Sequence, residues 1–121
     1  MNINIKATNM ELTGAISDYV NKRLSGLDKF IKEGEMVIYV EVAKTTNHHK
    51  QGDVFKAEFR VDISGANFYT FSEKEDIYEA IDIAKSEIVR KITNNKDRKQ
   101  TLFKRGALRI KKMIKDISKH N

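Results

Sequence analysis

One flank of a predicted helix in the second half of the chain carries side chains suited to binding. On a helical wheel, Tyr78, Asp82, Lys85, Val89 and Lys96 fall along this flank, beside an apolar stripe. A tyrosine, an acid and a lysine at this spacing can be ordinary i,i+3 and i,i+4 pairing on a helix surface. They can also form a polar ridge, with lysine on phosphates and tyrosine on a sugar or a base. The pattern leaves both interpretations open.

The sequence offers little support for catalysis or metal binding. His48 and His49 are adjacent in a polar loop, where neighbouring side chains point apart and chelate a metal poorly. No serine lies in a nucleophile-elbow context, and there is no glycine-rich phosphate loop. The acids between residues 73 and 82 complement the macrodipole at a helix start, which accounts for them without chemistry. We expect no enzyme activity, no cofactor and no metal, although a nuclease using Asp76 and Asp82 stays as an alternative.

The charge of the chain is unevenly distributed. Residues 1–95 hold 13 Lys/Arg and 15 Asp/Glu, a net of −2, whereas residues 96–121 hold 10 Lys/Arg and two Asp, a net of +8. Clustered cations gain free energy by releasing counterions from phosphates, so this pattern favours a polyanionic partner. From charge alone the candidate partners are RNA, DNA and an anionic membrane surface.

Length and composition indicate one domain with an appendage. The 121 residues can bury one modest core, and the absence of cysteine excludes a disulfide framework. The start of the chain has no apolar run typical of a signal peptide, and no apolar stretch is long enough to span a membrane. We expect a soluble, cytoplasmic protein that is monomeric when free.

Hydrophobic periodicity predicts the elements that would position these side chains. Alternating or β-branched segments predict strands at 2–7, 36–43, 54–63 and 68–71, with a loop at 44–53 and a turn at 64–67. Thr13 is expected to cap a helix over 14–31, and the capping-box pair Ser72 and Glu75 to open a second helix. The order β-α-β-β-β-α with one apolar stripe per helix predicts an α+β two-layer sandwich, a four-stranded sheet with both helices on one face.

The basic tail has its own pattern. Its apolar residues fall on one helical face and its lysines on the arc opposite, which is typical of an amphipathic helix. This helix could dock on the body or a partner, form on RNA, or lie on a membrane surface. We expect a domain at 1–97 and a basic amphipathic extension at 98–121.

Three stretches of the chain form a pattern when taken in order. They are residues 9–16 continuing to 24–30, residues 48–58, and residues 75–82, Glu-Asp-Ile-Tyr-Glu-Ala-Ile-Asp, which basic residues follow. Together they resemble the ribosome hibernation-promoting factors, also called ribosome-associated translation inhibitors or sigma-54 modulation proteins. The first stretch is similar to the family's first helix, the second to its His/Lys-Gly loop and third strand, and the third to its motif Asp-hydrophobe-Tyr-x-Ala-Ile-Asp. The resemblance covers about residues 1–99. Nothing after Lys99 resembles the dimerising domain of the family's long form, so the chain looks like a short form.

The resemblance implies a fold akin to double-stranded-RNA-binding domains, and a binding function. Such a protein binds ribosomal RNA and neighbouring proteins of the small ribosomal subunit in the channel used by messenger and transfer RNA. It competes with both RNAs, blocks translation and preserves idle ribosomes in stress or stationary phase. No membrane and no DNA partner is expected. A general double-stranded-RNA-binding module is the alternative.

The resemblance also implies which side chains contact ribosomal RNA. The expected contacts are Lys22, Arg23, Lys29, Lys44, His49, Lys50, Tyr78, Lys85, Arg90, Lys91, Lys96, Arg98 and Lys99. In the extension, the expected RNA contacts are Lys104, Arg105, Arg109, Lys111 and Lys112.

Overall fold

The computed structural model describes residues 1–30, 34–45 and 52–95. Along the chain it contains β1 (Asn2–Thr8), α1 (Gly14–Leu24), the 3-10 helix η1 (Leu27–Phe30), β2 (Met36–Thr45), β3 (Val54–Ile63) and β4 (Ala66–Lys74). A second helix follows and is described over residues 77–95. The chain divides after Lys91, and the packing below is that of residues 1–91.

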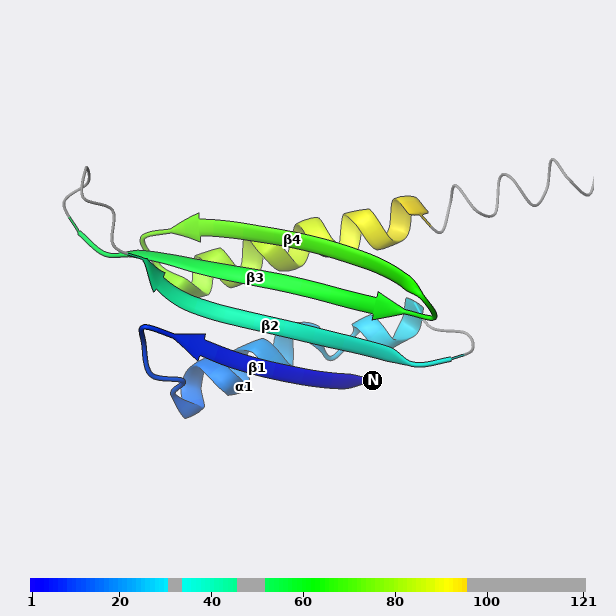
Figure 1. Ribbon diagram of the computed structural model, residues 1–121, viewed down its shortest axis with the longest axis horizontal. Coiled ribbons are helices and arrows are strands. Elements are labelled where there is room, and N and C mark those ends of the chain that lie inside the picture. Colours follow the sequence, from blue (N-terminus) through cyan, green and yellow to red (C-terminus); the bar gives the residue numbers. More distant parts are fainter. Residues whose placement is uncertain (31–33, 46–51, 96–121) are drawn as a thin grey trace, which may run out of the picture. The chain divides into compact units, whose positions relative to one another are not determined.

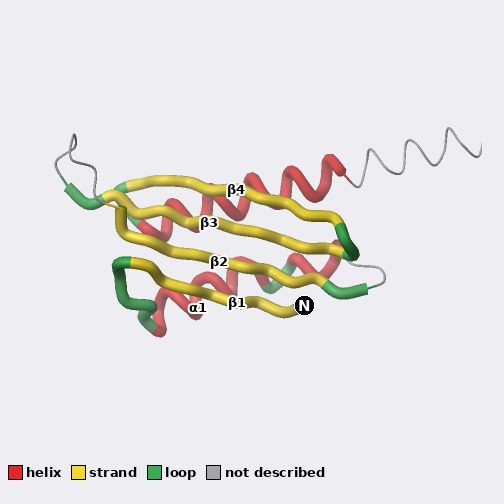
Figure 2. Tube along the Cα trace, in the orientation of Figure 1, coloured by secondary structure: helices red, strands yellow, loops and turns green. Residues whose placement is uncertain are grey.

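The strands form one four-stranded mixed sheet in the order β1-β2-β3-β4 (Figure 1). β1 lies at an edge and runs parallel to β2, whereas β2, β3 and β4 form an antiparallel meander. Figure 2 shows α1 and the second helix together behind the sheet. The α+β class and the order β-α-β-β-β-α predicted from the sequence are confirmed.

The core lies between this sheet face and the two helices. Alternate side chains of β2 and β3 turn inward, because successive residues of a strand point to opposite faces. The helices contribute residues spaced by three and four positions. The most buried strand residues are Met36, Ile38, Val40, Val42, Ala57, Phe59 and Val61, and their helical counterparts are Val20, Leu24, Ala80, Ile81, Ala84 and Ile88.

The predicted helix 14–31 was too long. α1 ends at Leu24, its C-cap residue is Ser25, and a 3-10 helix covers 27–30. Gly26 lies at the break, and glycine is a poor residue for a helix interior. Leu27 is nevertheless buried, so the apolar stripe continues although the α-helix does not. The Thr13 cap is confirmed, since its Oγ1 accepts a hydrogen bond from the amide of Ile16 at 3.2 Å.

The predicted start of the second helix was also wrong. Ser72 lies inside β4 and is buried, with the strand running to Lys74. β4 pairs with β3 as far as the pair of Phe55 and Lys74. Because these strand hydrogen bonds include Ser72, it cannot cap the helix as its residue type suggested. Asp76 instead accepts a hydrogen bond from the Tyr78 amide at 2.9 Å.

The β3–β4 turn is tighter than the predicted 64–67. Only Ser64 and Gly65 lie outside the strands, and both have positive φ, 48° and 88°. Positive φ at both central residues is characteristic of a two-residue type I′ hairpin. The 44–53 loop is likewise shorter at its start, because β2 continues through Thr45. Residues 46–51 of that loop lie outside the described residues.

Candidate nucleic-acid interface

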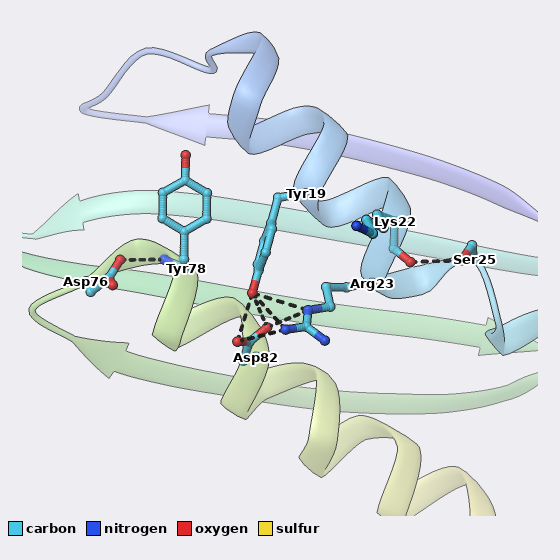
Figure 3. Close-up of polar contacts among 7 residues, drawn as sticks. All are labelled: Tyr19, Lys22, Arg23, Ser25, Asp76, Tyr78 and Asp82. Atoms are coloured by element: carbon cyan, nitrogen blue, oxygen red, sulfur yellow. Dashed lines mark hydrogen bonds and ion pairs between the residues drawn. The ribbon is translucent and has the colours of Figure 1, made fainter.

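A polar cluster joins α1 to the second helix on the side away from the sheet (Figure 3). The Tyr19 hydroxyl donates to the two carboxylate oxygens of Asp82, at 2.7 and 2.8 Å. Arg23 donates to the Tyr19 oxygen from Nε at 3.2 Å and from an Nη at 3.0 Å. The Arg23 Nε also lies 2.9 Å from Asp82 Oδ1. A carboxylate, a phenol and a guanidinium therefore link the two helices. Asp82 is 63 residues from Tyr19 and 59 residues from Arg23 in the sequence.

The local sequence explains why these groups meet. Tyr19 and Arg23 are four residues apart on α1, so they lie on the same face of the helix. The Tyr78 ring packs edge-to-face against Tyr19, with ring centroids 4.9 Å apart. Tyr78 and Asp82 are also four residues apart on the second helix. Two i,i+4 pairs thus face each other across the helix–helix contact.

The cluster favours the charged form that Arg23 already has at neutral pH. Hydrogen bonding to Tyr19 and the negative charge of Asp82 raise the pKa of Arg23 further above its ordinary value. Its side chain is still 47% exposed, so the positive charge remains accessible to solvent and to a partner. Asp82 therefore orients Arg23 without removing it from the surface.

A groove beside this cluster gathers three cations. It has a volume of about 440 Å³ and is lined by Tyr19, Lys22, Arg23, Gly26 and Lys85. Lys22 and Arg23 come from α1 and are exposed, whereas Lys85 comes from the second helix and is partly buried. Because Gly26 carries no side chain, it adds no bulk to the wall. Lysine and arginine converging from two elements match the chemistry that contacts phosphates.

The structure does not gather all the predicted contacts at this groove. Lys29, in η1, lies over the Phe30 ring at 5.3 Å. Lys44, in β2, pairs with Asp53 at 3.3 Å. Lys91 donates to the backbone carbonyl of Tyr69 in β4 at 2.7 Å. Arg90 is exposed on the second helix and does not line the groove.

The remaining predicted contacts lie outside the described residues. Those expected to contact ribosomal RNA through the family resemblance are His49, Lys50, Lys96, Arg98 and Lys99. In the extension they are Lys104, Arg105, Arg109, Lys111 and Lys112.

Sequence reasoning missed Tyr19. The only signal available was its position four residues before Arg23, on the flank of the α1 apolar stripe. That spacing does not reveal that the hydroxyl reaches Asp82 on another helix. Asp82, which the helical wheel placed on a candidate ridge, proves to be the acceptor at the centre of the cluster.

The acids considered for a nuclease have local partners. Asp76 caps the second helix, and Asp82 is held by Tyr19 and Arg23. Among residues 1–30, 34–45 and 52–95, no group of three His, Asp or Glu side chains is arranged to hold a metal ion. No helix in the described part of the chain is long and apolar enough to cross a membrane.

Comparison with known proteins adds independent evidence. The family model described as Sigma 54 modulation protein / S30EA ribosomal protein matches residues 3–100. A ribosome hibernation promoting factor of Azotobacter vinelandii is 30% identical over 98 residues, which cover 81% of this chain and 85% of that protein. The corresponding protein of Klebsiella oxytoca is 28% identical, with 81% and 96% covered.

Solved structures agree with the fold. The crystal structure of the Thermus thermophilus Protein Y N-terminal domain superposes with a TM-score of 0.66 at 32% identity, covering 78% of this chain and 98% of that domain. A ribosomal subunit interface protein from Coxiella burnetii has the same fold, with a TM-score of 0.63 at 16% identity and coverage of 80% and 99%. The family match over residues 3–100 and the relative at 30% identity lead to one conclusion: the chain belongs to the Sigma 54 modulation protein / S30EA ribosomal protein family.

Proposed function

We propose that this protein is a cytoplasmic ribosome hibernation factor. It binds ribosomal RNA of the small subunit in the messenger and transfer RNA channel, blocks translation and preserves idle ribosomes under stress or in stationary phase. Its action is binding rather than catalysis. Membership of the family supports this proposal, as do relatives named ribosome hibernation promoting factor that are matched over most of their length.

The observation that carries the proposal is the groove between α1 and the second helix. Lys22, Arg23 and Lys85 present three cations within one concave surface, and Asp82 orients the arginine. Phosphate groups of a folded RNA offer the complementary charge. In this proposal residues 1–97 provide the specific contact, and the extension at 98–121 adds electrostatic affinity.

The number of phosphate contacts in the groove predicts how strongly binding to the small subunit depends on salt concentration. If three cations each neutralise one phosphate, log K falls against log salt with a slope of about −2.7, or about 40-fold between roughly 50 and 200 mM. Contacts outside the groove add to this slope. Co-sedimentation of the full chain with purified small subunits over a salt series measures it.

The variant Lys85→Glu tests the groove against a matched control. It removes one phosphate contact and adds repulsion, so we expect a salt slope shallower by about one to two and binding weakened by about tenfold at roughly 0.1 M salt. Lys74→Glu makes the same charge change at the exposed end of β4, and we expect it to bind like the unchanged protein. Equal loss in both variants would show that only net charge matters and would refute the groove as the interface.

Two competition arms separate the ribosomal function from general RNA binding. Initiator transfer RNA with messenger RNA should displace the protein from small subunits. Naked duplex RNA of equal phosphate concentration should compete much less. A protein that binds duplex RNA and subunits with equal affinity would be the general double-stranded-RNA-binding module instead.

A further inference from the structure

The outer face of the sheet, opposite the helices, carries exposed aromatic side chains. This face is turned toward the viewer in Figure 1. Tyr39, Tyr69 and Phe71 are 51%, 40% and 53% exposed. Among the described residues only Met1 and Leu12 are further exposed large hydrophobic side chains. Three such rings on one face are not needed for the core, which lies on the other side.

The strand register brings these rings together with cations. Tyr39 on β2 pairs with Arg60 on β3, which in turn pairs with Tyr69 on β4. The Arg60 guanidinium lies 5.9 Å from the Tyr69 ring centroid, and the Tyr69 and Phe71 centroids are 6.3 Å apart. Lys56 lies 5.8 Å from the Phe71 ring. Three neighbouring strands therefore share one surface of rings and cations.

A hollow of about 220 Å³ opens in this surface beside Tyr39. Its polar lining is Asn4, Lys6, Glu41, Glu58 and Arg60. The volume is below the roughly 300–1,000 Å³ of a typical small-molecule pocket, so it suits a single ring or side chain.

Two carboxylates in the hollow face each other. Glu41 and Glu58 are directly paired across β2 and β3, an arrangement that is destabilising for like charges. Glu58 accepts a hydrogen bond from Tyr69 and lies 3.6 Å from Lys56. Glu41 forms no hydrogen bond or ion pair with another described residue. Its oxygens are therefore available to accept from a ligand.

These groups match the parts of a nucleotide. An exposed ring stacks on a base, lysine and arginine contact phosphate, and a carboxylate accepts from an exocyclic amine such as cytosine N4. We propose that the hollow binds an unpaired nucleotide of RNA, with the base stacked on Tyr39 and its amine donating to Glu41. RNA as the partner class rests on the proposed function, but the site lies on the face opposite the helix groove.

The charge of the outer face distinguishes this site from the groove. By strand alternation its charged residues are Lys6, Lys56, Arg60, Glu41, Glu58, Asp62 and Glu73. Three cations against four carboxylates give no net attraction for a polyanion. Affinity at this face therefore comes from stacking and hydrogen bonding, and it depends little on salt.

The test is a binding titration of the full chain with hexacytidylate and hexauridylate, followed by NMR. The two probes carry the same charge, so electrostatic attraction by the basic tail cancels in their ratio. We expect signals of Tyr39, Arg60 and Tyr69 to shift with hexacytidylate, and this probe to bind more tightly than hexauridylate. Glu41→Ala should remove the preference.

Substitutions of the ring complete the test. Tyr39→Ala should weaken hexacytidylate binding about fivefold to a hundredfold, the range for loss of one base–aromatic stack. Tyr39→Phe keeps the ring and should bind within about twofold of the unchanged protein. Leu12→Ala, a truncation of an exposed apolar residue elsewhere, is the matched control. Unchanged binding by Tyr39→Ala, or shifts confined to the helix groove, would overturn the proposal.

Small subunits distinguish the possible occupants. A photoreactive benzoylphenylalanine in place of Phe71 should crosslink to ribosomal or messenger RNA, whereas adducts with ribosomal proteins alone would make this face a protein-docking surface and refute the inference. If hexacytidylate is not preferred but Lys85→Glu still weakens binding to small subunits, only this inference is refuted. If hexacytidylate is preferred but Lys85→Glu binds small subunits normally, only the proposed groove interface is refuted.

Discussion

Removing the Tyr19 hydroxyl is the most informative single perturbation of the helix–helix cluster. Tyr19→Phe deletes the donor to both Asp82 oxygens and the acceptor used by Arg23, while the ring that packs against Tyr78 remains. The phenol is partly buried between two helices, so water replaces its hydrogen bonds only in part.

The expected cost follows from this geometry. A hydrogen bond to a charged group contributes about 1.5–3 kcal/mol to stability, and because the Asp82 side chain is 39% exposed we expect about 1–1.5 kcal/mol. For a domain of this size that corresponds to a lowering of the melting temperature by about 5–10 °C.

Thermal and urea unfolding followed by circular dichroism measure this loss. Tyr78→Phe is the control, because its hydroxyl forms no hydrogen bond with another described residue. We expect that variant to lose less than about 0.5 kcal/mol. A double-mutant cycle with Asp82→Asn should give a favourable coupling energy. If Tyr19→Phe is no less stable than Tyr78→Phe, the cluster does not hold the helices together and the reasoning fails.

Three further perturbations test other contacts. Thr13→Ala removes the α1 cap and should cost about 0.5–2 kcal/mol in urea unfolding, whereas Thr13→Ser should retain most of the stability; equal loss in both would argue against the cap. Thr70→Val deletes the buried hydrogen bond to the Ala84 carbonyl at 2.9 Å and should cost about 0.5–1.5 kcal/mol, and an unchanged urea midpoint would contradict this. The hydrogen bond to Glu58 raises the pKa of Tyr69 above the ordinary value of about 10. This hydrogen bond therefore stabilises the folded protein fully below pH ~10, and its contribution is lost as the pH rises through the pKa of Tyr69 in the folded state. Absorbance titration should show a late-ionising tyrosine that is absent in Tyr69→Phe, and no difference between the two titrations would refute the assignment.

The core residues were predictable because the hydrophobic periodicity that marks them lies within single strands and helices. Alternation along β3 and the three-to-four spacing of the second helix identified the buried faces, and Phe59, Val61, Ile81 and Ile88 are fully buried as expected. The ends of elements were less predictable because local signals compete there with tertiary pairing. Ser72 has the residue type of a cap, yet the ladder to β3 holds it in a strand.

The candidate site was predictable only in part. Asp82 and Lys85 stood out because their spacing places them on one flank of a helix, whereas Lys22 and Arg23 were expected only through the family resemblance. The contact between Tyr19 and Asp82 spans 63 residues, and no local pattern encodes it. The pairing of Tyr39, Arg60 and Tyr69 likewise depends on strand register, which becomes visible only when the sheet is assembled.

A density map of the small ribosomal subunit with this protein bound would show where the protein binds and which side chains face ribosomal RNA. We predict that the protein occupies the messenger and transfer RNA channel, with Lys22, Arg23 and Lys85 facing phosphates of ribosomal RNA. Binding elsewhere on the subunit, or a groove open to solvent in the bound state, would contradict the account.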